Sequence, residues 1–185
     1  DNYSDKIYGI YVGYVKEGSV NVTVDNAAIS IENRGVIQND PNDYGKYAAI
    51  ALDHVSAPST ITLKHADLTY RSNTGVIQKN FFNAVSLSHC SGDVTILIDN
   101  TVFNSMTHGI TIVDCTGTVT LKIQNCSDDP IQTYNTYNQN QQPAYDIIVY
   151  NCSSDFTLKL EVDGEEKGSR TGANGKYNIS QTNFN

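Results

Sequence analysis

The sequence predicts an all-β protein, and composition, periodicity and internal repetition all indicate this class. The 185 residues are rich in Asn, Thr, Ser, Val, Ile and Tyr, which favour strands and turns. Apolar and polar residues alternate over short stretches from end to end, and no stretch has the i, i+3, i+4, i+7 spacing of a stable helix. A 39% apolar content at this length is enough to bury one core, so a single domain is expected.

Five octets repeat along the chain, and each begins a segment of the same design. The third, fifth and eighth positions are apolar in every octet. The octets are YGIYVGYV (8–15), AAIALDHV (48–55), NAVSLSHC (83–90), HGITIVDC (108–115) and YDIIVYNC (145–152). A polar turn and a second strand follow each one, namely SVNVTV (19–24), STITLK (59–64), DVTILI (93–98), TVTLKI (118–123) and DFTLKL (155–160).

These columns predict a β-solenoid in which equivalent strands of successive repeats stack in parallel, about 4.8 Å apart. A third short strand is expected in RGVIQND (34–40) and TGVIQKN (74–80). The usual hand of parallel crossovers favours a right-handed path. The expected fold is therefore a right-handed parallel β-helix of about five coils, with three short strands per coil, over residues 1–162. Residues 163–185 are expected to be a polar C-terminal tail, a cap or an exchanged segment.

In this pattern of columns, the chain resembles the right-handed parallel β-helix superfamily. The superfamily includes pectate lyases, polygalacturonases, phage tailspikes and autotransporter passengers, and the nearest resemblance is to autotransporter adhesin passengers. The resemblance implies an extracellular or cell-surface protein with a structural or adhesive role. Such a protein would be a self-assembling filament subunit or part of an adhesin. The alternative is a carbohydrate-active hydrolase or lyase, or a tailspike-like glycan binder.

Charge and hydropathy limit the partners. A net charge of −8 argues against nucleic acid, which requires a basic surface. No apolar run approaches the roughly 20 residues of a membrane helix, so no membrane insertion is expected. Copies of the chain joined end to end through open strand edges are the expected partners, together with glycans or host or surface proteins.

The sequence predicts a non-enzymatic protein with no catalytic residue and no cofactor. Enzymes of the resembled superfamily carry carboxylates on the outward side of the first strand, and here Asp53 is the one acid at those positions. The segment HGITI (108–112) looks like the GHG-type motif of polygalacturonases, but Thr107 precedes it and the accompanying acidic motifs are absent. The outward positions are Tyr11, Ala51, Ser86, Thr111, Ile148, Gly13, Asp53, Ser88, Val113 and Tyr150.

The seventh octet position holds His54, His89, Asp114 and Asn151, which would line up at strand spacing. We expect a solvent-edge polar ladder and no metal site. His54, His89 and Asp114 are the candidate ligands should a metal bind.

Two other rows are expected to be structural. The core is predicted to contain a stack of buried thiols at Cys90, Cys115 and Cys152, without a CxxC zinc pattern. An asparagine ladder is expected at the bend after the second strand, at Asn26, Asn100 and Asn125.

The segment 127–145 is rich in Asn, Gln and Tyr and offers a possible contact surface for glycans or protein. Its candidate contact residues are Tyr134, Tyr137, Asn138 and Gln139. A long solvated insertion is the alternative interpretation.

Overall fold

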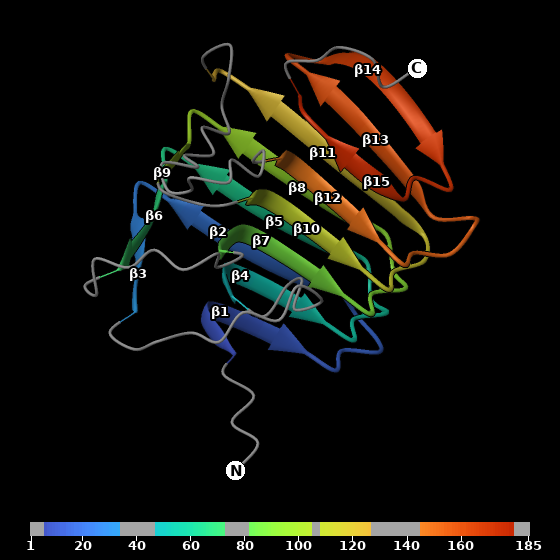
Figure 1. Cartoon of the computed structure of the whole chain (residues 1–185), viewed down its shortest axis with the longest axis horizontal. Coiled ribbons are helices and arrows are strands. Elements are labelled where there is room, and N and C mark those ends of the chain that lie inside the picture. The colour runs from blue at the N-terminus through green and yellow to red at the C-terminus, as the bar shows by residue number, and fades with distance from the viewer. Residues whose placement is uncertain (1–5, 34–46, 73–81, 105–107, 127–144, 180–185) are drawn as a thin grey trace, which may run out of the picture.

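The computed structural model describes residues 6–33, 47–72, 82–104, 108–126 and 145–179. All helical or strand structure in these ranges is β-strand, which confirms the predicted all-β class (Figure 1). None of these residues belongs to a helix long and apolar enough to cross a membrane.

The strands form two large sheets and one small sheet. The first sheet has the order β1 (Ile7–Gly13), β4 (Tyr47–Asp53), β7 (Phe82–Ser88), β10 (His108–Val113), β12 (Tyr145–Tyr150) and β15 (Gly175–Tyr177). The second has the order β14 (Glu165–Thr171), β13 (Thr157–Val162), β11 (Thr118–Gln124), β8 (Val94–Asp99), β5 (Ser59–Lys64) and β2 (Val20–Asp25). The third contains β3 (Ala28–Asn33), β6 (Asp67–Ser72) and β9 (Val102–Asn104).

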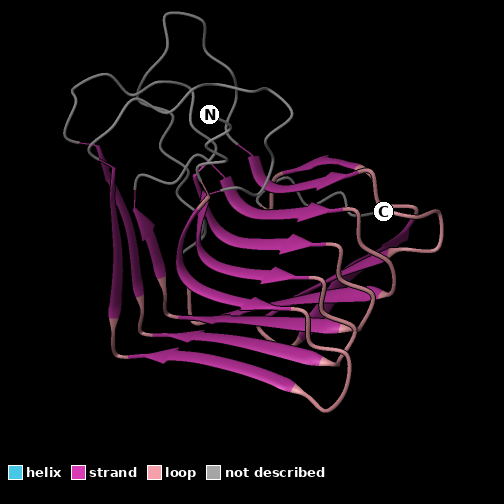
Figure 2. Cartoon of the chain, turned by 90° about the horizontal axis from the view of Figure 1, so that it is seen from below, coloured by secondary structure: helices cyan, strands magenta, loops and turns pink. Residues whose placement is uncertain are grey.

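Each sequence repeat adds one parallel strand to each large sheet, and equivalent positions are paired. In the first sheet, Ile110 lies between Val85 and Ile147. In the second, Leu121 lies between Ile96 and Leu160. The two large sheets lie over one another, and the third stands at one side (Figure 2).

The predicted right-handed parallel β-helix of about five coils with three strands per coil is wrong. The described strands form three separate sheets of six, six and three strands, which is a layered arrangement. The third sheet takes strands from the first three repeats alone in the described ranges, and each large sheet ends in an antiparallel strand. Apolar periodicity shows which side chains face a core, but it does not fix how strands divide among sheets. The third strands predicted at 34–40 and 74–80 lie outside the described residues.

The core lies between the sheets and contains the apolar columns of the repeat. The second sheet alternates buried and more exposed residues, as in a strand with one face on a core. Its buried column positions are Val22, Val24, Ile61, Leu63, Ile96, Ile98, Leu121, Ile123, Leu158 and Leu160.

The inner strands β4 and β10 of the first sheet are buried on both faces, whereas Tyr11 of β1 and Tyr150 of β12 are exposed. Every residue of β4 is buried. On β10, Thr111 is fully buried, and its hydroxyl donates to Asn83 Oδ1 at 2.6 Å. The other buried outward residues are Ala51, Asp53, Ser86 and Ile148. Parallel strands covered on both sides read as continuous buried runs, and this is the pattern found here.

The segment after Val162 closes one end of the molecule. β14 pairs antiparallel with β13, and β15 pairs antiparallel with β12. Asn174 accepts from the backbone amide of Cys152 at 2.8 Å and donates to its carbonyl at 2.9 Å, while Ala173 is buried in the core. Residues up to 179 are therefore a folded cap on the same chain, whereas residues 180–185 lie outside the described ranges.

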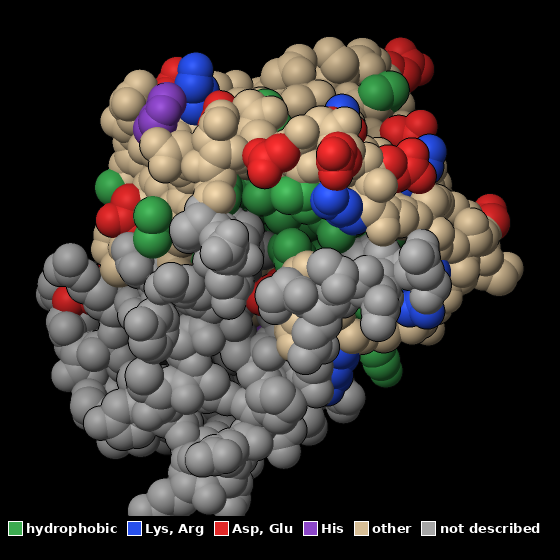
Figure 3. Space-filling model, turned by 90° about the horizontal axis from the view of Figure 1, so that it is seen from above, with side chains coloured by type: hydrophobic (Ala, Val, Ile, Leu, Met, Phe, Trp, Pro, Cys, Tyr) green, Lys and Arg blue, Asp and Glu red, His purple; other side chains and the backbone are tan. Residues whose placement is uncertain are grey.

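The surface reflects the acidic composition. On the face shown in Figure 3, acidic side chains lie near one another beside a small area of apolar side chains. Basic side chains are interspersed among them, so the face is not a basic surface of the kind that nucleic acid requires.

Candidate functional site

The candidate site is a row of side chains at the bend that follows the strands of the first sheet. We call it the first-bend row. Each of its members has a left-handed backbone conformation, which Asn, Asp and His adopt more readily than most other residues. The members and their φ angles are Tyr14 (62°), His54 (55°), His89 (52°), Asp114 (52°) and Asn151 (54°).

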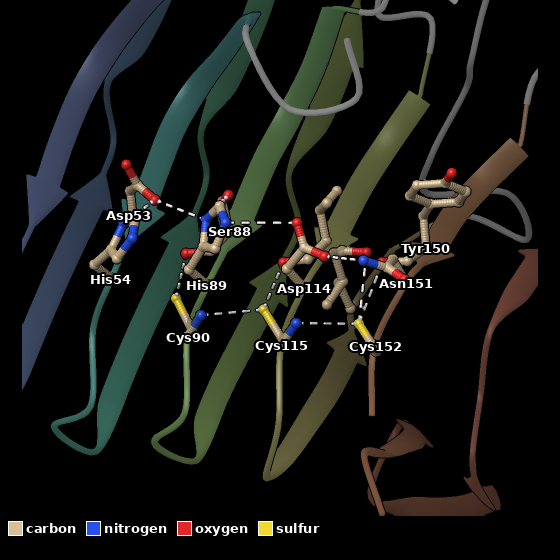
Figure 4. Close-up of polar contacts among 12 residues, drawn as sticks. Asp53, His54, Ser88, His89, Cys90, Asp114, Cys115, Tyr150, Asn151 and Cys152 are labelled. Atoms are coloured by element: carbon tan, nitrogen blue, oxygen red, sulfur yellow. Dashed lines mark hydrogen bonds and ion pairs between the residues drawn. The ribbon is translucent and has the colours of Figure 1, made fainter. Parts of the chain in front are cut away.

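Backbone hydrogen bonds hold successive bends at strand spacing. The amide of His54 donates to Ser88 O at 2.9 Å, and that of His89 donates to Val113 O at 3.0 Å. The turns are thus continuous with the parallel ladder of the sheet, and their side chains emerge side by side (Figure 4).

Two histidines of this row and the adjacent Asp53 bring three possible metal-ligand groups together. The carboxylate oxygen Oδ1 of Asp53 lies 2.8 Å from Nδ1 of His54 and 3.4 Å from Nδ1 of His89. One ligand atom from each of these three residues lies within 4.8 Å of the other two. The side chain of Asp53 is 9% exposed, whereas those of His54 and His89 are 45% and 48% exposed.

The surroundings of Asp53 keep it ionised. Desolvation by burial raises the pKa of this carboxyl, but the hydrogen bond and charge of His54 and a hydrogen bond from Tyr11 outweigh that effect. The pKa therefore lies below its ordinary value. The Tyr11 hydroxyl donates to Oδ2 of Asp53 at 3.2 Å, so both carboxylate oxygens are held.

The other nitrogen of His89 faces a second carboxylate. Its Nε2 lies 3.5 Å from Oδ2 of Asp114. The other oxygen of Asp114, Oδ1, accepts a hydrogen bond from the side-chain amide of Asn151. Nδ1 of His89 also lies 2.8 Å from the hydroxyl of Ser88. His89 therefore has a polar neighbour at each ring nitrogen, and its tautomer decides which nitrogen donates and which accepts.

Aromatic rings extend the row at the β1 end. The rings of Tyr14 and His54 stack at 4.9 Å, and those of His54 and His89 stack at 4.4 Å with an interplanar angle of 13°. Tyr14 and Tyr11 are largely exposed, at 69% and 46%. The row therefore presents aromatic, imidazole, carboxylate and amide groups along one line.

The cysteine row lies directly beneath. The backbone amide of Cys90 lies 3.4 Å from Sγ of Cys115, and the amide of Cys115 lies 3.4 Å from Sγ of Cys152 (Figure 4). All three residues are buried, and they and the partly exposed Cys126 are free thiols. Contacts with the sulfurs of Cys152 and Cys90, together with burial, raise the pKa of the Cys115 thiol.

The bend after the second strand forms a separate row. Asn26, Asn100 and Asn125 all have positive φ there, as do His65 and Asp163. The side-chain amide of Asn125 donates to the Asp99 carboxylate at 2.8 Å, and that of Asn26 donates to the Asp25 carboxylate at 2.9 Å. These two side chains thus bond to aspartates, and the row is more mixed than the asparagine ladder expected.

The structure combines two groups that the sequence left apart. In the sequence, His54 and His89 share one octet position, whereas Asp53 is an isolated acid among the outward positions. Of the two histidines, Asp114 contacts His89, at the ring nitrogen that faces away from Asp53. The missed signal was the Asp-His dipeptide at the end of the second octet, because a left-handed turn lets adjacent side chains meet. The contact residues Tyr134, Tyr137, Asn138 and Gln139 lie outside the described residues.

Comparison with known proteins leaves the resemblance to the β-helix superfamily a prediction. No protein-family model, curated protein or solved structure matches the chain.

Proposed function

We propose that this chain is a non-enzymatic structural or adhesive protein of the cell exterior, and that it associates with a second copy through the open edges of β1 and β2. The supporting observation is the position of these two strands. They are the outermost strands of the two large sheets at the same end, and each is paired on one side only within the described residues (Figure 1).

The open edges present backbone groups for another strand. The amides of Val20 and Asn26 donate toward β5, to Pro58 O and Lys64 O. Alternate residues of a strand face opposite neighbours, so the amides of Asn21 and Thr23 face the open edge of β2. Such an edge is a template for pairing with another chain.

The opposite end is protected. β14 carries a register shift against β13 between Leu160 and Glu161, and four of its seven residues are charged (EEKGSRT). β15 has only three residues. Bulges, charges and short strands are the devices that block edge pairing, so the β1 and β2 end is the one suited to association.

A second copy fits this end because the same edge is self-complementary. A two-fold axis normal to the large sheets would pair β1 with its copy and β2 with its copy, both antiparallel. This isologous contact joins the molecules end to end and closes at a dimer.

Sedimentation velocity tests this proposal. Thr23→Pro removes an edge-facing amide while leaving the β5 pairing in place, because proline is tolerated where a strand N–H faces outward. The matched control Thr23→Ala keeps the amide. We expect the unaltered chain and Thr23→Ala to sediment as dimers and Thr23→Pro as a monomer. A monomeric unaltered chain at about 100 μM, well above a micromolar Kd, would refute the proposal.

A glycan-binding surface is a second candidate function, favoured by exposed tyrosines in and beside the first-bend row. Tyr11, Tyr14 and Tyr150 are 46%, 69% and 49% exposed, and tyrosine gives contact area with little loss of entropy. Titration with polygalacturonate and neutral polysaccharides tests binding. Turnover of the polymer that is lost in Asp53→Ala would instead establish a carbohydrate-active enzyme.

A further inference from the structure

The spacing of the donor atoms around Asp53 matches that of ligands sharing one metal ion. In a tetrahedral zinc site with bonds of 2.0–2.1 Å, neighbouring ligand atoms lie about 3.3 Å apart. The oxygen of Asp53 lies 2.8 Å and 3.4 Å from the Nδ1 atoms of His54 and His89. The two separations that involve the carboxylate are therefore already close to those of a coordinated set.

The backbone and the surrounding side chains preorganise the three groups. Asp53 is buried and held by Tyr11, and the two histidines stand on bends fixed to neighbouring strands. The rings of His54 and His89 are nearly parallel. Each ring therefore has to rotate modestly before both nitrogens point at one metal ion. Their half-exposed side chains have room to turn, while the carboxylate beneath them stays in place.

Asp114 supplies the contact that metal-binding histidines usually make with their second nitrogen. When Nδ1 of His89 binds a metal, Nε2 carries the proton, and Asp114 Oδ2 lies 3.5 Å from that nitrogen. A carboxylate in this position fixes the tautomer and increases the basicity of the ring. The Asn151 amide in turn donates to Asp114, which helps to orient the carboxylate.

We propose that Asp53, His54 and His89 bind a divalent transition-metal ion of the zinc type, with Asp114 as the positioning residue for His89. Two imidazoles and one carboxylate suit zinc, nickel, copper or cobalt, whereas calcium and magnesium take oxygen ligands. Three protein ligands leave a coordination position for water or for a group on another molecule.

Calorimetric titration of the untagged full chain with zinc chloride tests the site, and cobalt absorption gives an independent readout of coordination. The probe variants are His54→Asn and His89→Asn, because asparagine already occupies left-handed bends in this chain and should preserve the fold. The matched control is His65→Asn. His65 is also half exposed, at a left-handed bend, with its Nδ1 3.8 Å from an Asp25 oxygen.

We expect one zinc ion per chain, at least about a tenfold loss of affinity in either probe variant, and no change in His65→Asn. Asp114→Asn should weaken binding by about tenfold while leaving the stoichiometry at one. Absence of saturable binding below about 1 mM would overturn the proposal. Equal losses in His65→Asn, or unchanged affinity in both probe variants, would also overturn it.

Discussion

The stacked core makes a quantitative prediction at Ile112. This residue is fully buried on β10, between Leu87 of β7 and Val149 of β12, which are buried as well. Ile112→Ala removes three carbon atoms, worth about 2.4 kcal/mol in transfer free energy. Neighbouring strands hold Leu87 and Val149 in place, so the site cannot collapse and a cavity cost adds to the transfer cost. We expect a total loss of about 3–4 kcal/mol in the free energy of unfolding.

Urea unfolding followed by circular dichroism measures this loss, with Thr120→Ala on the half-exposed side of β11 as the control. The control should stay within about 0.5 kcal/mol of the unaltered chain. In a chain of this length each kcal/mol corresponds to about 2–4 °C, so Ile112→Ala should lower Tm by roughly 6–16 °C. Equal stability of Ile112→Ala and Thr120→Ala would refute the buried, tightly packed position of Ile112 in the core.

Three further predictions concern titration and reactivity. In the folded protein a thiol reagent should modify the partly exposed Cys126 first, and Cys115 only on unfolding; equal rates in folded protein would contradict the buried row. Burial, reinforced by the charge of Asp53, raises the pKa of Tyr8 to about 12, so its stabilising effect is complete below pH 10 and is lost as pH rises toward 12. Subtracting the ultraviolet titration of Tyr8→Phe from that of the unaltered chain should isolate the deprotonation of the Tyr8 hydroxyl at high pH. The pKa of Asp53 is lowered, so its contribution to stability is present above about pH 4 and is lost as pH falls through its folded value. Urea midpoints of Asp53→Asn should therefore fall less between about pH 5 and 3 than those of the unaltered chain; a parallel fall would contradict this.

The sequence alone determined the strand content and the inward columns. Alternation such as that of Ile61 and Leu63 is a local property, because side chains of a strand point to opposite faces with a period of two. Recurrence of the same alternation at Ile96 and Leu121 predicted parallel pairing of equivalent strands, which the register confirms.

Only the tertiary structure decided the division into three sheets, the burial of the second face and the cap. Thr111 and Ile112 have opposite orientations in the sequence pattern, yet both are buried, because exposure of a face depends on what covers it and not on the strand itself. The polar segment from Asp163 onward has no apolar period, and its strands exist because β12 and β13 offer unpaired edges.

The candidate site shows the same limit. The sequence aligned His54 with His89 because both occupy one repeat position, but it could not show that the carboxylate of Asp53 turns toward both rings. That meeting depends on the left-handed bend at His54 and on the strand spacing that brings residues 35 positions apart into contact. Local pattern fixes which face a side chain takes, whereas its neighbours across strands are fixed by register and turn geometry, which arise only when the sheets assemble.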